Sequence, residues 1–285
     1  MSGRRARRAD NARQMARLLD ERGIQTEARA TAGPNHATRL AREAVADGSE
    51  IVISYGGDGT LNEVLQGMVG SPASLAVWAG GTANVVARDL CLPADVERLA
   101  DVIAAGKTRR ITLGLARSEA AKERYFFMFA GIGLDASIAR KVNPKLKRRT
   151  GEFAFWVEGI KHILTWRAEP FTLEIDGKKF ESVFALIGNG KGYGGGFCMA
   201  PNADLEEPLF EVYMVPKRAT NLAYLRDLAA VARGNPGIKG VNIVKGRHVK
   251  ANSSDEPWVE VDGELIGPLP MTFDVVPDAL SVIVP

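Results

Sequence analysis

The feature that most constrains this chain is a glycine-rich turn, Gly56-Gly57-Asp58-Gly59-Thr60, which lies between two apolar segments. The segment at 50–55 is short and rich in β-branched residues, which predicts a buried strand. A helix is expected from about Leu61 to Val69. Glycines let the backbone approach an anion closely, and the helix N-terminus offers unpaired N–H groups. The segment therefore predicts a phosphate-binding turn.

Asp58 introduces a carboxylate into this turn. An acid in a phosphate site repels the ligand unless a metal ion or a substrate hydroxyl stands between them. Asp58 therefore favours the handling of a Mg²⁺-nucleotide over passive anion binding. The alternative is a glycine turn that Asp58 caps, since short motifs are weak when they stand alone. As an acid in an exposed loop, Asp58 is expected to contribute little to packing.

The composition fits a folded chain with a large core. Of its 285 residues, 46% are apolar and 25% are charged, which excludes a mainly disordered protein and suits one large domain or two smaller ones. We expect no transmembrane segment, since no run of about 18 apolar residues is present, and no secretory signal peptide. Two cysteines are too few for a disulfide framework. We expect a cytoplasmic protein whose net charge of +3 requires no nucleic acid.

The two parts of the chain differ in pattern. Up to Gly106, helices alternate with strands, which predicts a parallel sheet covered on both faces. We expect helices at 5–22, 36–46, 61–69 and in two segments that end near 105, and strands at 24–29, 50–55 and 75–78. Beyond Gly106 strands dominate, which predicts an antiparallel, sandwich-like domain. Strands are expected there at 107–117, 125–130, 170–176, 179–187, 209–215, 238–250, 257–262, 271–276 and 279–284, and helices near 150–166 and 220–233.

Five ordered motifs carry a resemblance to a known family. They are GGDGTLNEV at 56–64, GGTANVVARDL at 80–90, GIGLDA at 131–136, GNGKGYGGG at 188–196 with AP at 200–201, and VDGE at 261–264. In this order they resemble the diacylglycerol-kinase catalytic-domain family of lipid kinases, which includes bacterial lipid kinases and sphingosine kinases. The resemblance spans nearly the whole chain, so it is more specific than any single motif.

The resemblance implies two domains. The first is an α/β nucleotide-binding domain of the NAD kinase/diacylglycerol kinase-like kind, which we place at 1–112. The second is an antiparallel β-sandwich domain for the lipid substrate, which we place at 113–272. In the family the last strand often returns to the first domain, so the resemblance implies that 273–285 does so here.

The resemblance also implies which residues bind ATP with its Mg²⁺. They are Thr31, Gly56, Gly57, Asp58, Gly59, Thr60, Leu61, Asn62, Glu63, Thr82 and Asn84. Thr82 and Asn84 follow Gly80-Gly81 at a predicted strand-to-helix turn, where a hydroxyl and an amide can donate to phosphate. Capping of the next helix is the alternative role of both side chains.

The VDGE motif supplies two more acids, Asp262 and Glu264, on either side of Gly263. Phosphoryl transfer to a lipid hydroxyl needs an acceptor for its proton, and the family's acceptor corresponds to this turn. Both residues are therefore candidates for catalysis, together with Asp58. The alternative is a hairpin turn with solvated acids.

Asp135 in GIGLDA would be the third acid of the active site, with Arg88 as a partner. The alternative for Asp135 is an ordinary acid at a helix N-terminus, where the helix dipole favours negative charge.

The sequence departs from the family in three places. Val85 stands where the family usually has an acid. The family opens with a strand and an Asn-Pro-x-Ser-Gly loop, whereas this chain starts at Met1-Ser2-Gly3, so the true start lies upstream or the fold tolerates the gap. The third departure concerns a metal loop.

The family's loop for a structural Mg²⁺ normally carries an Asp-Gly pair. The aligned stretch is 204–209, where a metal would be ligated by Asp204, Glu207 and the carbonyl of Leu209. Glu207 keeps a carboxylate on a longer arm, but Pro208 replaces a residue able to take positive φ with one whose φ is locked at about −65°. We therefore expect this metal to be absent or weakly bound.

A basic run followed by aromatic residues lies at 141–166. Lys145, Lys147, Arg148 and Arg149 can meet anionic headgroups, and Phe153, Phe155, Trp156 and Trp166 suit the interface between water and acyl chains. The alternative is an ordinary helix that packs these aromatic residues into the core. The basic run favours a protein peripheral to the inner face of the membrane, where its lipid substrate lies. A homodimer is compatible with the sequence.

These observations predict an ATP- and Mg²⁺-dependent lipid kinase in phospholipid metabolism, with diacylglycerol as the favoured acceptor. One alternative is a soluble-substrate kinase, because NAD kinases also carry GGDGT. The GGTAN turn, the glycine run at 192–196 and the VDGE motif favour the lipid kinase. The other alternative is a non-catalytic lipid-binding or regulatory homologue, which only the changed metal loop and the N-terminus support.

Overall fold

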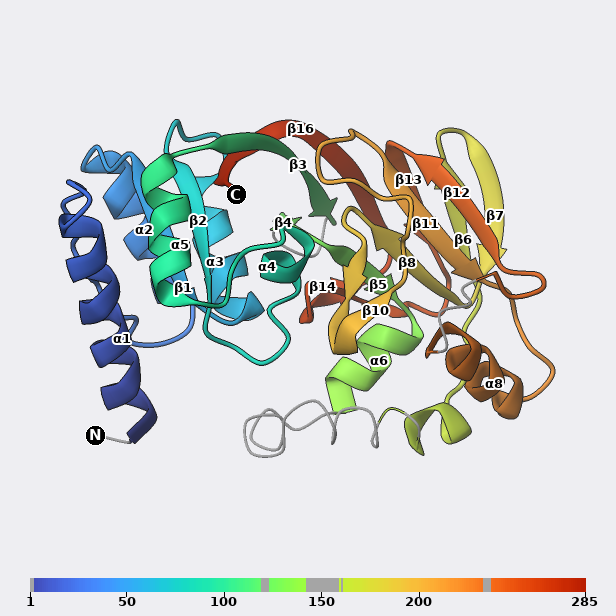
Figure 1. Ribbon diagram of the computed structural model, residues 1–285. Coiled ribbons are helices and arrows are strands. Elements are labelled where there is room, and N and C mark those ends of the chain that lie inside the picture. The colour runs from blue at the N-terminus through green and yellow to red at the C-terminus, as the bar shows by residue number, and fades with distance from the viewer. Residues whose placement is uncertain (1–2, 119–122, 142–158, 160, 233–236) are drawn as a thin grey trace. The chain divides into compact units, whose positions relative to one another are not determined.

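The computed structural model of the chain describes residues 3–118, 123–141, 159, 161–232 and 237–285 (Figure 1). The chain forms two compact units. Unit 1 comprises Met1–Ile111 and Ala279–Pro285, and unit 2 comprises Thr112–Asp278. The chain thus enters unit 2 once and returns to unit 1 with its C-terminal segment.

Unit 1 is built on a short parallel sheet. β1 (Ile51–Gly56) pairs with β2 (Ser74–Ala79), and β2 pairs with the end of β16 (Met271–Ile283). Parallel neighbours need a crossover, which α3 (Asp58–Met68) provides between β1 and β2. α3 also packs against α2 (His36–Ala46). The glycine-rich turn therefore lies at the carboxyl end of β1, directly before α3.

Two further helices, α1 (Gly3–Asp20) and α5 (Val96–Ala105), share an apolar core with the strands of unit 1. The buried members of this core are Met15, Leu19, Ala76, Trp78, Leu99, Ala100, Ile103 and Ile283. Met15 and Leu19 are one turn apart, as expected from the helical spacing. Asp95 caps α5 by accepting from the N–H of Arg98, and Gly106 ends the helix with φ 63°.

Unit 2 is a β-sandwich. Its first sheet contains β7 (Lys178–Ser182), β6 (Phe171–Ile175), β13 (His248–Asn252) and β16. β3 (Thr108–Arg117) pairs with β16, and β4 (Arg124–Phe126) pairs with β3. The second sheet has the order β12 (Asn242–Gly246), β11 (Phe210–Val215), β8 (Phe184–Gly188), β5 (Phe129–Ile132), β14 (Trp258–Val261) and β15 (Glu264–Pro268), and every pair in it is antiparallel. Buried side chains from both sheets, among them Phe126, Phe210 and Phe273, form one core.

Residues that alternate with this core lie on the outer face of the second sheet. Val259 and Val261 of β14 belong to the core, whereas Glu260 between them has the opposite orientation. The register places Glu260 opposite Gly131, Gly131 opposite Leu186, and Leu186 opposite Tyr213. α6 (Leu134–Lys141) contacts β5, β14 and β15. A row of four residues thus crosses the outer face of four neighbouring strands.

The structure confirms the predicted fold class and corrects several elements. Residues 24–29 form no strand, although Ile24 packs against the core of unit 1. The predicted strands at 125–130, 179–187 and 238–250 are each two strands, β4–β5, β7–β8 and β12–β13, because the chain passes from one sheet to the other within each of them. The segments at 271–276 and 279–284 are the single strand β16. Alternation of apolar residues does not reveal which sheet a strand joins.

Candidate functional site

The two glycine turns of unit 1 pack directly against each other. The N–H of Gly80 donates to the carbonyl of Gly56 at 2.7 Å. A Cβ atom on Gly81 would lie 2.5 Å from the Cα of Gly57, which is closer than real Cβ contacts allow. Larger residues would push the turns apart, so this glycine serves the contact between the two turns as well as any approach by a ligand.

Asp58 joins the same two turns. Its Oδ1 accepts from the N–H of Val85 at 2.7 Å, and its Oδ2 accepts from the N–H of Asn84 at 2.9 Å. Both N–H groups belong to the start of α4 (Val85–Asp89), and Asp58 itself is half-buried. The expectation of an exposed acid that contributes little to packing is therefore wrong. Asp58 is an acid whose two oxygens are held by backbone amides.

Asn84 closes its own turn rather than capping a helix. Its Oδ1 accepts from the N–H of Gly81 at 2.9 Å, and its Nδ2 donates to the carbonyl of Gly81 at 3.1 Å. Its backbone is left-handed, with φ 48°, which asparagine tolerates better than most residues. Thr82, in the same turn, is exposed.

A small pocket lies beside these turns within unit 1. Its lining residues are Ser54, Gly56, Gly57, Asp58, Leu61, Val77, Ala79, Asn84 and Ala87. The hydroxyl of Ser54 is buried and has no hydrogen-bond partner among the described residues. The first N–H groups of α3 also lack intrahelical acceptors, as at any helix N-terminus. Sequence reasoning missed Ser54, since a serine within a buried strand gave no signal of its own.

Seven other predicted residues do not line this pocket: Thr31, Gly59, Thr60, Asn62, Glu63, Thr82 and Arg88. Glu63 accepts from the N–H of Ala37 at 3.1 Å, which places its carboxylate at the start of α2. Asn62 is buried and accepts from Gln66 at 3.3 Å, while Thr31 and Arg88 are exposed. The ATP contacts predicted for Thr31, Asn62 and Glu63 remain predictions.

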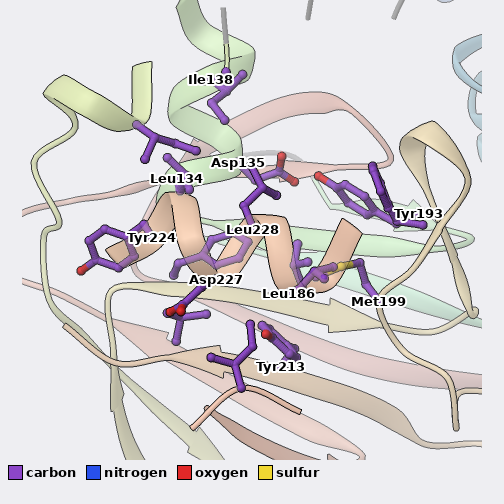
Figure 2. Close-up of a pocket in the computed structure, with 17 residues that line it drawn as sticks. Leu134, Asp135, Ile138, Leu186, Tyr193, Met199, Tyr213, Tyr224, Asp227 and Leu228 are labelled. Atoms are coloured by element: carbon purple, nitrogen blue, oxygen red, sulfur yellow. The ribbon is translucent and has the colours of Figure 1, made fainter. Parts of the chain in front are cut away.

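Unit 2 contains a larger, mostly apolar pocket (Figure 2). Its cavity volume is about 100 Å³. Its floor is the outer face of the second sheet, with Leu186 and Tyr213, and its walls include Ile138 of α6 and Leu228 of α8 (Asn221–Ala232). Figure 2 shows these side chains around one space, together with Met199. A pocket with this lining suits the apolar part of a small molecule.

One end of this pocket carries two polar side chains, Asp135 and Tyr193. Asp135 is in the first turn of α6, and Figure 2 shows its carboxyl group facing the Tyr193 hydroxyl. Glu260 lies beside Asp135, since a Cβ atom on Gly131 would be 2.7 Å from both Oδ2 of Asp135 and Oε1 of Glu260. Glu260 is only 3% exposed. Burial, and secondarily the nearby charge of Asp135, raise the pKa of Glu260 well above its usual value, and the same causes raise the pKa of Tyr193.

Within unit 2 the neighbours of Asp135 are Tyr193 and Glu260. The predicted partnership of Asp135 with Arg88 of unit 1 remains a prediction. Sequence reasoning missed Glu260 altogether. Its only signal was a charged residue at the centre of the apolar segment Trp258–Val261.

The other end of the pocket carries an ion pair. Nε of Arg218 lies 2.8 Å from Asp227, which is buried on α8. The backbone N–H of Arg218 donates to the hydroxyl of Tyr224 at 2.9 Å. Burial, with a smaller contribution from Asp227, raises the pKa of Tyr213 to about 12. This end of the pocket is held by interactions among its own residues.

The VDGE motif forms the hairpin between β14 and β15. Asp262 and Gly263 both have positive φ, 46° and 83°, as a tight two-residue turn requires. The Asp262 carboxylate accepts three backbone N–H groups, from Phe127 at 2.7 Å, Met128 at 3.0 Å and Phe129 at 3.1 Å. Glu264 forms an ion pair with Arg124. Asp262 is thus fixed to the link between β4 and β5, whereas Glu264 is paired with a side chain.

The predicted metal loop holds its acids in other interactions. Asp204 accepts from the N–H of Glu206 at 3.0 Å, and the Glu207 carboxylate lies 2.9 Å from the Lys245 ammonium group. A cation on Glu207 would have to displace this ammonium, so the donor set does not fit a structural Mg²⁺ at Asp204, Glu207 and Leu209. Within the described part of the chain, no group of three His, Cys, Asp or Glu side chains converges on a metal position.

Most of the predicted membrane segment, including Lys145, Lys147, Arg148, Arg149, Phe153, Phe155 and Trp156, lies outside the described residues. Trp166 is described and is buried against Tyr224 in an edge-to-face contact, which agrees with a role in packing. None of the helices in the described part of the chain is long and apolar enough to span a bilayer.

Two family profiles match the chain. The diacylglycerol kinase catalytic domain matches residues 1–116, and the YegS C-terminal NAD kinase beta sandwich-like domain matches residues 129–284. Together they cover both units. The second match ends in the strand that returns to unit 1.

Named relatives and solved structures agree with these matches. A protein named diacylglycerol kinase from Bacillus subtilis is 32% identical over 91% of this chain and 86% of its own length, and one from Staphylococcus saprophyticus is 31% identical over 90% and 83%. The crystal structure of a diacylglycerol kinase from Bacillus anthracis has the same fold, with a TM-score of 0.78, 21% identity and coverage of 97% of this chain and 92% of that one. The chain belongs to the diacylglycerol kinase catalytic-domain family.

Proposed function

We propose that this protein is an ATP-dependent lipid kinase whose acceptor is a neutral lipid alcohol, with diacylglycerol as the favoured substrate. The observation that carries the proposal is the apolar pocket of unit 2, which has a carboxyl-bearing end. The apolar walls suit acyl chains, because burial of each CH₂ group contributes about 0.8 kcal/mol. The polar end offers Asp135 as an acceptor for a hydroxyl group.

We assign nucleotide binding to the glycine turns of unit 1. Ser54 brings a buried hydroxyl without a partner among the described residues, and α3 begins beside it. A helix N-terminus and a donor hydroxyl complement phosphate oxygens. In this role Asp58 sets the distance between the two turns, and the resemblance adds Gly59, Thr60 and Thr82 as contacts.

The protein has to contribute little covalent chemistry to this reaction. The lipid oxygen attacks the γ-phosphorus of ATP, the bond from that phosphorus to the β–γ bridging oxygen breaks, and ADP leaves while the hydroxyl proton passes to a base. Such transfers depend mainly on positioning and on stabilisation of charge. The accompanying divalent cation would neutralise phosphate charge.

Of the two VDGE acids, Glu264 is the better candidate for the base. The Asp262 carboxylate already accepts three backbone N–H groups, which makes it a fixed element of the turn. Glu264 is half-exposed and forms an ion pair with the side chain of Arg124, which can release it. Glu264→Gln should lower kcat by about 10²-fold or more with little change in the KM for ATP.

The direct test is incubation with labelled ATP, Mg²⁺ and a panel of acceptors: diacylglycerol, other lipid alcohols and NAD. Labelled phospholipid formed from diacylglycerol is the expected product, and chelation of Mg²⁺ should stop its formation. Labelling of NAD alone would support the soluble-substrate alternative. Lipid binding without any transfer, in protein that also binds ATP, would support a non-catalytic homologue.

Glu181→Gln is a suitable control, because Glu181 is an exposed residue of β7 on the first sheet of unit 2. It should leave the transfer rate unchanged. A loss of activity in this variant equal to that of Glu264→Gln would remove the case for Glu264.

A further inference from the structure

Asn189 is a fully buried amide in the GNGKGYGGG segment, directly after β8. Its Nδ2 donates to the carbonyl of Phe127 at 2.8 Å and to the carbonyl of Thr112 at 2.9 Å. The backbone N–H groups of Asn189 and Gly190 both donate to the carbonyl of Met128, at 2.8 and 3.3 Å. Phe127 and Met128 join β4 to β5 and are called the β4–β5 link below. Both carbonyl groups of this link are therefore bound by the GNGKGYGGG segment.

The N–H groups of the β4–β5 link bind Asp262. Phe127 and Met128 donate to its carboxylate, as does Phe129 at the start of β5. The N–H of Asp262 donates back to the carbonyl of Phe129 at 2.9 Å. A buried link between two strands needs a partner for every backbone N–H and carbonyl group. Here Asp262 supplies the acceptor, and the GNGKGYGGG segment supplies the donors.

The β4–β5 link is connected to Glu264 in two ways. Asp262 precedes Glu264 by two residues in the same hairpin, so a shift of the link moves the turn that carries Glu264. Arg124, which forms the ion pair with Glu264, belongs to β4 and lies three residues before the link. The backbone of Glu264 and the partner of its carboxylate are thus both attached to one short segment.

We propose that Asn189 is a positioning residue, which holds the β4–β5 link where Asp262 and Arg124 place the Glu264 carboxylate to accept the proton of the lipid hydroxyl. This rests on the proposed function, in which Glu264 is the base. The amide of asparagine suits the role, because it offers two N–H donors without a charge. The position of a base matters for turnover, since a displacement of about 1 Å can cost about 10²-fold in rate.

A second hairpin of unit 2 provides a matched control. Asp176 and Gly177, between β6 and β7, have positive φ, 45° and 84°, as the VDGE turn does. The Asp176 carboxylate accepts from the N–H groups of Arg247 and His248, each at 3.0 Å, where β12 passes into β13. β12 and β15 are at opposite ends of the second sheet. Asp176→Ala therefore loosens a similar link in the same unit without changing a partner of Glu264.

The first test is the effect of Asn189→Ala on each kinetic constant. kcat should fall about tenfold, because the base is displaced. The KM values for ATP and for the lipid should change by less than about twofold, since the β4–β5 link lines neither pocket. Asp176→Ala should leave kcat unchanged. When Glu264→Gln is already present, Asn189→Ala should lower kcat by less than about twofold further, because the group that it positions is gone.

A second readout does not depend on catalysis. Hydrogen exchange, measured by mass spectrometry on a peptide that covers residues 124–132, should become about tenfold faster in Asn189→Ala, because the link has lost donors and opens more often. Asp176→Ala should instead accelerate exchange around residues 245–250. Asn189→Ser retains one donor in its hydroxyl group, and it provides the same comparisons if Asn189→Ala does not fold.

The outcomes separate this proposal from the proposed function. If lipid is phosphorylated but Asn189→Ala keeps its kcat, or lowers kcat by the same factor with and without Glu264→Gln, the positioning role is wrong and the kinase stands. Unchanged exchange at residues 124–132 would also overturn the role of Asn189. If no lipid is phosphorylated, the proposed function fails, and with it the positioning role, whatever the exchange rates show about the link.

Discussion

Glu260 and Asp262 are two residues apart on one hairpin, yet their surroundings give the two acids opposite properties. Asp262 meets three backbone N–H groups, which solvate a negative charge as water would. Glu260 is buried beside the Asp135 carboxyl group and accepts one N–H group, and its pKa is raised first by burial and second by the charge of Asp135. Backbone amides allow an acid to stay charged when it leaves bulk water, whereas a second acid requires one of the pair to be neutral.

Asp58 and Asp135 repeat this contrast in the two units. Asp58 accepts two backbone N–H groups and ties two turns together, whereas Asp135 lines a pocket and faces the Tyr193 hydroxyl. Removal of an acid held by amides should therefore mainly cost stability, and removal of a pocket acid should mainly affect the substrate. The following variants test that distinction.

The largest effect is expected for Asp262→Ala. Three backbone N–H groups would lose their acceptor, and each orphaned buried donor costs about 1–3 kcal/mol, so unfolding should become easier by about 4 kcal/mol. Urea denaturation followed by circular dichroism measures this. Asp262→Asn retains one acceptor oxygen and should lose about half as much. A loss below about 1 kcal/mol for Asp262→Ala would contradict the structural role.

Asp58→Ala should destabilise unit 1 by about 2 kcal/mol, because two N–H groups of one turn lose their acceptor. Since the turns would separate, binding of ATP should weaken as well, which isothermal titration would detect. Glu43→Ala removes an exposed acid of α2 in the same unit and is the control. Weaker ATP binding without any loss of stability would show that Asp58 acts on the nucleotide and not on the turns.

Asp135→Asn should leave the protein as stable as before and raise the KM for the lipid about tenfold, a difference of about 1.4 kcal/mol. The reason is that the amide keeps the shape of the side chain but lacks the charge that accepts the substrate hydroxyl. Steady-state kinetics at several lipid concentrations, with ATP in excess, provide the measurement. An unchanged KM for the lipid would place Asp135 outside the substrate site.

The smallest effect is expected for Tyr193→Phe. The change removes the hydroxyl that faces the Asp135 carboxyl group, so the KM for the lipid should rise about threefold while stability changes by less than about 1 kcal/mol. Combination with Asp135→Asn should cost less or more than the sum of the two single changes, because the two side chains face each other. Strict additivity would argue against a shared role.

Several parts of the site could be predicted from sequence because they depend on local geometry. The GGDGT turn between strand and helix, the second glycine turn and the VDGE hairpin all depend on residues that are near one another in the chain. Their positions in the structure follow the predicted ones closely. Their acids were harder to interpret. The donors to Asp58 lie 26 and 27 residues away along the chain, and those to Asp262 lie 133 to 135 residues away.

The sequence alone determined the family, the change from alternating elements to a β-sandwich, and the chemistry of the glycine turns, because each of these is expressed in short-range pattern. Only the tertiary structure decided which acids are held by backbone N–H groups and which lie beside another acid. That depends on what a side chain meets across the sheet, and Glu260 meets Asp135 only because Gly131 leaves room on the neighbouring strand. The pKa of an acid depends on its solvation. Inside a protein this solvation comes from neighbouring groups, which can be far away in the sequence.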